Sequence, residues 1–129
     1  MTVSSEALHI MVVDDHELTR CVLMHALLRQ GFISRVQVAA HGRDVIAQLG
    51  QMSPEQHPDL ILMDLHMPVM DGWAASTWIK KHYPYIKIVA YSAAEGGHRQ
   101  AKQHGATIDA FCDKGECTQS LLQTIQQVL

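Results

Sequence analysis

Three short runs of apolar residues limit the folds open to this chain more than any other feature of its sequence. They span residues 8–13, 60–63 and 86–90, and each is nearly continuous. Strands of a parallel sheet have this pattern because they are buried on both faces, whereas strands of a half-exposed antiparallel sheet alternate between apolar and polar residues. We therefore expect a parallel sheet that is covered by helices on both faces.

The rest of the chain alternates between strand-like and amphipathic segments. Expected strands span residues 8–13, 36–40, 59–64, 86–92 and 108–113, and expected helices span 17–30, 43–50, 72–82, 94–104 and 117–129. Gly31 and Gly50 are positioned to end two helices, and Asp71 to cap the start of a third. Five strands and five helices joined by right-handed crossovers predict one doubly wound α/β sandwich, a single domain over residues 1–129.

Polar side chains follow four of the five expected strands. In such sheets the ligand site lies at the carboxyl ends of the strands. A single aspartate there could simply cap the next helix. Three carboxylates, a hydroxyl and a lysine at one edge instead predict a functional site. These residues are Asp14, Asp15, Asp64, Ser92 and Lys114.

The chemistry of this set points to phosphoryl transfer. Carboxylates that converge on one edge repel each other unless a cation lies between them, and oxygen ligands suit Mg²⁺. A carboxylate can itself act as a nucleophile and form an acyl phosphate. A metal ion, a lysine and a hydroxyl donor would then neutralise the charge on the transferred group.

Four motifs carry a resemblance to a known family. They are VVDDHE (12–17), DLILMDLHMPVMDG (59–72), IVAYSA (88–93) and GATIDAFCDKGE (105–116). In this order and spacing the chain resembles the receiver domain of response regulators, as found in chemotaxis and NarL/FixJ-type regulators, over essentially its whole length. The resemblance implies a CheY-like, flavodoxin-like (βα)5 fold with a parallel five-stranded sheet of order 2-1-3-4-5.

The resemblance also implies a role for each residue of the site. Asp64 would accept a phosphoryl group from a sensor histidine kinase or a histidine phosphotransfer protein. Asp14, Asp15, Asp64 and the backbone carbonyl of His66 would hold Mg²⁺, for which Mn²⁺ could substitute.

Three further residues would respond to the phosphoryl group. Lys114 would pair with the phosphoryl group and with Asp64, and Ser92 would hydrogen-bond a phosphoryl oxygen. Phe111 stands where the family has a switch aromatic residue. The surface of the fourth helix, fifth strand and fifth helix would then contact a downstream protein, or a second copy in a homodimer. Two positions depart from the family pattern: Gly115 follows Lys114 where proline is usual, and Ser92 replaces the commoner threonine.

Several residues near the site have simpler interpretations. His16 and His66 flank it, but imidazole matches Mg²⁺ poorly, so we expect exposed side chains rather than metal ligands. Tyr91 either belongs to the output surface or is partly buried at the end of its strand. Trp73 and Trp78 are expected to pack along their helix.

Composition excludes several function classes. The net charge is −3 and the basic residues are scattered, which argues against direct nucleic acid binding. No apolar run approaches the about 18 residues of a membrane span, and the N-terminus lacks a signal peptide pattern. The three cysteines, Cys21, Cys112 and Cys117, are widely spaced and fit thiols in a reducing cytoplasm.

Four alternatives stay open. A flavodoxin-like electron carrier would share the topology, but the acidic segment after the first strand would repel a flavin phosphate. An aspartyl phosphatase would need a second aspartate at the position of His66. The chain could also be a degenerate receiver that binds proteins without phosphorylation, or the N-terminal receiver of a longer DNA-binding regulator. In the favoured interpretation it is not an enzyme, because it modifies only itself and loses the phosphoryl group slowly.

Overall fold

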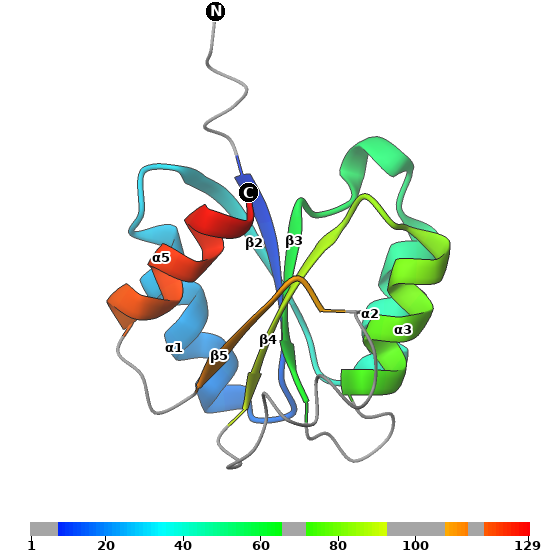
Figure 1. Cartoon of the computed structure of the whole chain (residues 1–129), viewed down its shortest axis with the longest axis horizontal. Coiled ribbons are helices and arrows are strands. Elements are labelled where there is room, and N and C mark those ends of the chain that lie inside the picture. Colours follow the sequence, from blue (N-terminus) through cyan, green and yellow to red (C-terminus); the bar gives the residue numbers. More distant parts are fainter. Residues whose placement is uncertain (1–7, 66–71, 93–107, 114–117) are drawn as a thin grey trace, which may run out of the picture.

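A five-stranded parallel sheet forms the centre of the molecule. The computed structural model describes residues 8–65, 72–92, 108–113 and 118–129. The strands are hydrogen-bonded in the order β2-β1-β3-β4-β5, which confirms the expected order (Figure 1). Their bounds are Leu8–Val13 for β1, Ile33–Ala39 for β2, Leu60–Asp64 for β3, Lys87–Ser92 for β4 and Ala110–Asp113 for β5.

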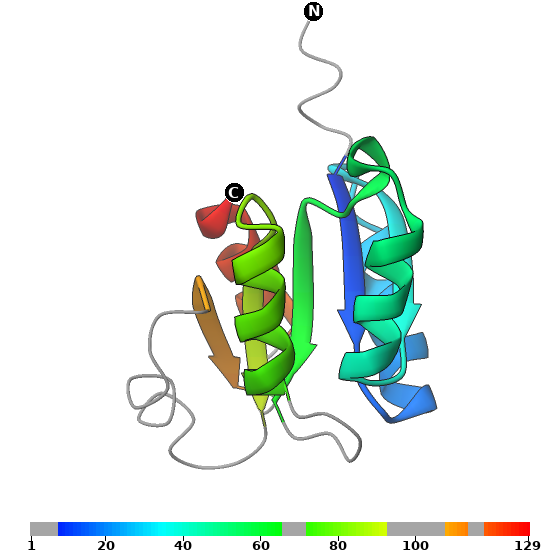
Figure 2. The same cartoon turned by 90° about the vertical axis from the view of Figure 1, so that its right-hand side faces the viewer.

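Helices cover both faces of this sheet. α1 and α5 lie on one face and α2 and α3 on the other, so that the sheet is the middle of three layers (Figures 1 and 2). Within the described residues the helices are α1 (Glu17–Leu28), α2 (Gly42–Gln51), α3 (Gly72–His82) and α5 (Thr118–Val128), with a short 3-10 helix, η2, at Pro54–Gln56. Among the described residues, no helix has the length and apolar character needed to cross a membrane.

Strand β3 shows why the central runs are apolar throughout. All five of its residues are buried. Ile61 and Met63 join the cluster beneath α2 and α3, whereas Leu60 and Leu62 join the cluster beneath α1 and α5. Successive side chains of a strand point to opposite faces, so a strand between two helical layers has no solvent-facing side. Each such leucine or isoleucine contributes roughly 2 kcal/mol by leaving water.

The expected elements differ from the observed ones mainly at their ends. β2 starts at Ile33, three residues before the expected start, because Ile33 is buried and pairs with Leu8. The exposed Ser34 and Arg35 interrupt the apolar pattern that would have revealed this start. α1 ends at Leu28 instead of residue 30.

The segments that connect the strands and helices were also compared with the expectations from sequence. The expected loop at 51–58 contains η2, where Ser53 and Gln56 form a capping box. The expected helix at 94–104 and the expected cap Asp71 lie outside the described residues.

Candidate functional site

Three aspartates come together where β1 and β3 end. β1 and β3 are parallel neighbours in which Val13 pairs with Met63, so the residues after these two positions lie side by side. One carboxylate oxygen from each aspartate (Asp14, Asp15 and Asp64) and one ring nitrogen of His16 all lie within 4.8 Å of one another. We call the three aspartates the carboxylate cluster. The structure thus brings together the three acidic residues that the sequence predicted.

Asp14 is held in place by several hydrogen bonds. It is completely buried, and the backbone N–H of His16 donates to its Oδ1 over 2.8 Å. Its own N–H donates to the carbonyl of Ala39 over 3.1 Å. The Arg20 guanidinium donates to its carbonyl oxygen over 2.7 Å. The His16 N–H contacts the carboxylate itself and offsets part of the cost of burying it, whereas the other two bonds hold the backbone of Asp14.

Tyr91 provides a further contact to Asp14, which sequence reasoning missed. The tyrosine is only 5% exposed, and its hydroxyl donates to Asp14 Oδ2 over 2.5 Å. Burial raises the pKa of Tyr91 well above its ordinary value, and the hydrogen bond to Asp14 raises it further. The phenol is therefore a neutral donor. Of the two expectations for Tyr91, an output surface or partial burial, burial at the strand end is the correct one.

Asp64 is the last residue of the central strand β3. It is 2% exposed and pairs in register with Tyr91 of β4. Gly72, the first residue of α3, packs against this strand end. A Cβ at Gly72 would lie 2.2 Å from the Asp64 carbonyl oxygen and 2.7 Å from Leu65 Cα, so only glycine allows α3 to start this close to β3.

The donor set of the carboxylate cluster fits a hard divalent cation. Three carboxylates provide oxygen ligands at one point, and such ligands suit Mg²⁺, Ca²⁺ and Mn²⁺. The predicted backbone ligand His66 lies outside the described residues.

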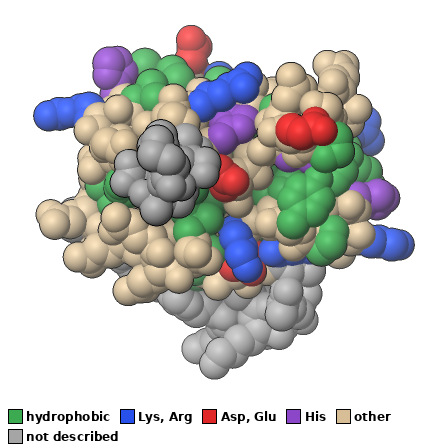
Figure 3. All heavy atoms as spheres, turned by 90° about the horizontal axis from the view of Figure 1, so that it is seen from above, with side chains coloured by type: hydrophobic (Ala, Val, Ile, Leu, Met, Phe, Trp, Pro, Cys, Tyr) green, Lys and Arg blue, Asp and Glu red, His purple; other side chains and the backbone are tan. Residues whose placement is uncertain are grey.

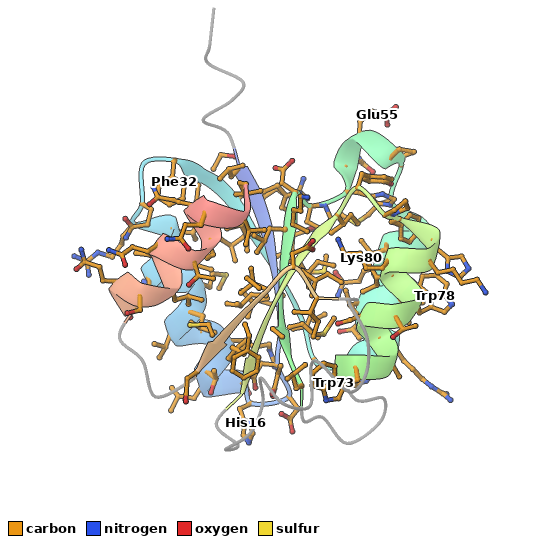
Figure 4. All side chains as sticks on the ribbon, in the orientation of Figure 1. His16, Phe32, Glu55, Trp73, Trp78 and Lys80 are labelled. Atoms are coloured by element: carbon orange, nitrogen blue, oxygen red, sulfur yellow. The ribbon has the colours of Figure 1, made fainter. Side chains whose placement is uncertain are left out.

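His16 lies beside the carboxylate cluster, at the lower edge of the sheet in Figure 4. Its side chain is 67% exposed, as expected from the sequence. Its ring nevertheless turns toward the cluster, because Nδ1 lies 3.2 Å from Asp14 Oδ1 and 3.1 Å from Asp15 Oδ1.

The other predicted site residues lie on β4 and β5 or beyond them. Ser92 ends β4 and pairs in register with Asp113. Phe111 is partly buried and packs against the cluster of Leu65, Trp73 and Ala90, and Trp73 reaches this end of the sheet from α3 (Figure 4). Lys114 and Gly115 lie outside the described residues. Trp78 is half-buried and stacks on His82 with ring centroids 3.9 Å apart.

Comparison with known proteins agrees with this geometry. Residues 10–126 match a family model described as the response regulator receiver domain. The response regulator protein VraR of Staphylococcus aureus is 31% identical over 118 residues, which cover 92% of this chain and 54% of the relative. This chain therefore spans about half the length of that relative.

Solved structures share the fold. The chemotaxis protein CheY4 of Vibrio cholerae superposes with a TM-score of 0.79 and 27% identity, covering 95% of this chain and 99% of that one. The response regulator TrrA of Thermotoga maritima, solved in complex with Mg²⁺ and BeF, gives a TM-score of 0.81 at 22% identity, with the same coverage of 95% and 99%.

Proposed function

The chain belongs to the response regulator receiver domain family, and from this premise we propose that it accepts a phosphoryl group on Asp64. The donor would be a phosphohistidine on a sensor histidine kinase or on a histidine phosphotransfer protein. The domain would work in the cytoplasm in two-component phosphorelay signalling.

One observation carries the proposal. Asp64 is delivered by the most completely buried strand to a point where its carboxylate meets those of Asp14 and Asp15. A strand end needs only one polar residue to leave the core. Three converging carboxylates cost free energy through mutual repulsion, and a bound cation would offset this cost.

The chemical step is a displacement at phosphorus. A carboxylate oxygen of Asp64 attacks the phosphorus atom and forms an acyl phosphate. The bond from phosphorus to the donor imidazole breaks, and its electron pair stays on that nitrogen. Mg²⁺, when bound by Asp14, Asp15, Asp64 and the His66 carbonyl, would neutralise charge on the phosphoryl oxygens. TrrA, a protein of the same fold, has been solved with Mg²⁺ and BeF, which supports this assignment.

The remaining site residues would position the reactants. The Tyr91 hydroxyl and the His16 N–H keep Asp14 in one orientation through both of its carboxylate oxygens. Lys114 would pair with the phosphoryl group, and Ser92 would donate a hydrogen bond to it. Phe111 packs at this end of β5, where it could follow a shift of the segment after Ser92.

The modification would be read by another protein. New charge at the carboxyl end of β4 and β5 would change the surface formed by the expected helix 94–104, β5 and α5. A downstream protein, or a second copy in a homodimer, would bind that surface. The domain would act as a substrate that modifies itself and loses the phosphoryl group slowly, rather than as an enzyme.

The length of the relatives favours a second candidate for the output. The VraR proteins extend well beyond the matched region, since it covers 54% of the S. aureus protein. The same receiver chemistry could therefore control a DNA-binding segment of a longer regulator.

Intact mass after treatment with acetyl phosphate and Mg²⁺ tests the proposal. We expect one added phosphoryl group on the wild type and none on Asp64→Asn. Asp59→Asn is the matched control, because Asp59 precedes the same strand at its opposite end, and it should be modified like the wild type. No modification of the wild type, or equal modification of Asp64→Asn, would show that the receiver is degenerate or phosphorylated elsewhere.

A further inference from the structure

We propose that the outer face of α1 is a self-association surface, on which two copies of the chain pack their α1 helices antiparallel about a two-fold axis. This surface is separate from the one formed by the expected helix 94–104, β5 and α5. It needs no phosphoryl group and no metal ion, so the inference goes beyond the proposed function.

Exposed apolar side chains gather on the outer face of α1. Five large apolar side chains are exposed among the described residues, and three of them belong to this helix: Leu18 at 76%, Val22 at 58% and Leu28 at 48%. Cys21 of the same helix is also exposed. A single exposed leucine is ordinary on a protein surface, whereas several together mark an interaction site.

These side chains form one stripe along the helix. At about 100° per residue, positions 17, 18, 21, 22, 25, 28 and 29 fall within an arc of about 140°, and all seven are exposed. We call the apolar members the α1 stripe: Leu18, Cys21, Val22 and Leu28. The opposite side of the helix already packs on the sheet through Leu23 and Leu27. A surface helix normally has a polar outer face, so a helix that is apolar on both sides indicates a second packing partner.

Opposite charges stand at the two ends of the α1 stripe. Glu17 begins the helix and Arg29 is its C-cap residue, about 18 Å away at about 1.5 Å per residue. Within the part of the chain that the structure describes, neither of them forms an ion pair. The helix dipole favours charges at these ends, but it gives no reason for the apolar side chains between them.

This order of charges makes the surface complementary to itself. In a two-fold interface a residue that contacts a second position is contacted in return by that position of the other copy. With the axis level with residue 23, Glu17 of each copy lies opposite Arg29 of the other, and Leu18 lies opposite Leu28. The charges then attract at both ends and the apolar side chains meet between them. A second copy is therefore the partner that fits.

The neighbouring helix adds no charge repulsion to this packing. α5 lies on the same face of the sheet as α1 (Figure 1), and none of its residues is charged. A hollow between the end of α1 and α5 has an uncharged lining as well, which includes Gln30, Phe32 and Leu122.

The size of the contact sets its expected strength. One pair of helices buries less surface than the about 1,200 Å² at which stable interfaces begin. We therefore expect a weak dimer with a dissociation constant on the order of 0.1 mM.

Sedimentation velocity tests the inference at concentrations below and above this constant, in EDTA and without a phosphodonor. Leu18→Gln and Val22→Gln should each weaken the dimer at least about tenfold, because every substitution occurs twice in a two-fold interface. Leu129→Gln is the matched control, since Leu129 is 48% exposed like Leu28 but lies outside the α1 stripe. Far-UV circular dichroism checks that each variant is folded. A wild type that stays monomeric throughout would leave the α1 stripe to a different protein and overturn the proposal, and so would an equal loss in Leu129→Gln.

An exchange of charges tests the antiparallel arrangement. Glu17→Arg and Arg29→Glu should each weaken self-association at least about threefold at low ionic strength, because like charges then face each other at both ends. An equimolar mixture of the two variants should restore the wild-type affinity, since every facing pair is then opposite in charge. A mixture no stronger than the separate variants would refute the arrangement.

Treatment with acetyl phosphate and Mg²⁺ separates this inference from the proposed function. A dimer that forms only after this treatment would belong to the output surface and overturn the proposal made here. Self-association in EDTA of a protein that acetyl phosphate does not modify would support this inference while the proposed function fails.

Discussion

The two ends of β3 each carry an aspartate, and the two residues have opposite surroundings. Asp59 precedes the strand, is exposed, and accepts a hydrogen bond from the His9 N–H over 2.9 Å. Its backbone links β1 and β4, because its N–H donates to the His9 carbonyl and its carbonyl accepts from Lys87. Asp64 ends the strand, is buried, and meets two further carboxylates.

A second aspartate at the amino end of the sheet shows the same contrast. Asp109 precedes β5, and its Oδ2 accepts the Ile88 N–H over 2.7 Å and lies 2.6 Å from Lys80 Nζ. Figure 3 looks onto this end, where acidic, basic and histidine side chains lie interspersed. An aspartate at a strand boundary is therefore not in itself a sign of function. What distinguishes the carboxyl end is that carboxylates gather there with each other.

The largest expected difference in folding stability is between a variant that loses a carboxylate at the amino end of the sheet and one that loses a carboxylate at the carboxyl end. Asp109→Ala should lower the free energy of unfolding by about 2 kcal/mol, because it removes a charged hydrogen bond to the backbone and the partner of Lys80. Asp15→Ala should cost nothing or stabilise by up to about 1 kcal/mol, because it relieves repulsion in the carboxylate cluster. Urea unfolding in EDTA measures both values, and equal losses would contradict the comparison.

Two tyrosine hydroxyls offer a smaller contrast, one on the buried Tyr91 and one on Tyr85, which is 55% exposed. Tyr91 donates to the Asp14 carboxylate, whereas the Tyr85 hydroxyl lies 2.5 Å from His57 Nδ1 at the amino end. A hydrogen bond to a charged group contributes about 1.5 to 3 kcal/mol, and one between neutral groups about 0.5 to 1.5 kcal/mol. Tyr91→Phe should therefore destabilise the protein by about 1 kcal/mol more than Tyr85→Phe in thermal and urea unfolding. A larger loss of unfolding free energy for Tyr85→Phe than for Tyr91→Phe would contradict this prediction.

The smallest expected effect is a pH dependence at the amino end. Burial lowers the pKa of His9 below its ordinary value, and Arg35 lowers it further. At His9 the folded protein therefore binds fewer protons than the unfolded chain just below pH 6.5. The contribution of neutral His9 to folding stability is complete above that pH and is lost as the pH falls. His9→Gln should flatten the fall in stability between neutral pH and pH about 5.5. The slope stays well under about 1.4 kcal/mol per pH unit because His9 is only partly buried. If the unfolding free energy of His9→Gln and of the wild type depended on pH with the same slope, this prediction for His9 would be contradicted.

Local pattern predicted most of the sheet and the acidic part of the site. Apolar runs located the strands within a few residues, and the polar residues at their ends located the carboxylate cluster. The start of β2 was missed because Arg35 and Ser34 hide a strand that is stabilised by pairing with β1. Pairing of this kind depends on a neighbour, and no pattern within the segment records it.

The amino-acid sequence alone was enough to predict the central apolar strands, the aspartates at their ends and the resemblance to receiver domains, because apolar runs and residue spacing are properties of each segment. Three contacts became visible only in the folded protein: Tyr91 donates to Asp14, 77 residues away, the His16 ring turns toward Asp14 and Asp15, and Gly72 lies against Asp64. These contacts depend on strand register and on where each helix starts relative to the sheet. Such distances arise only when the elements pack together.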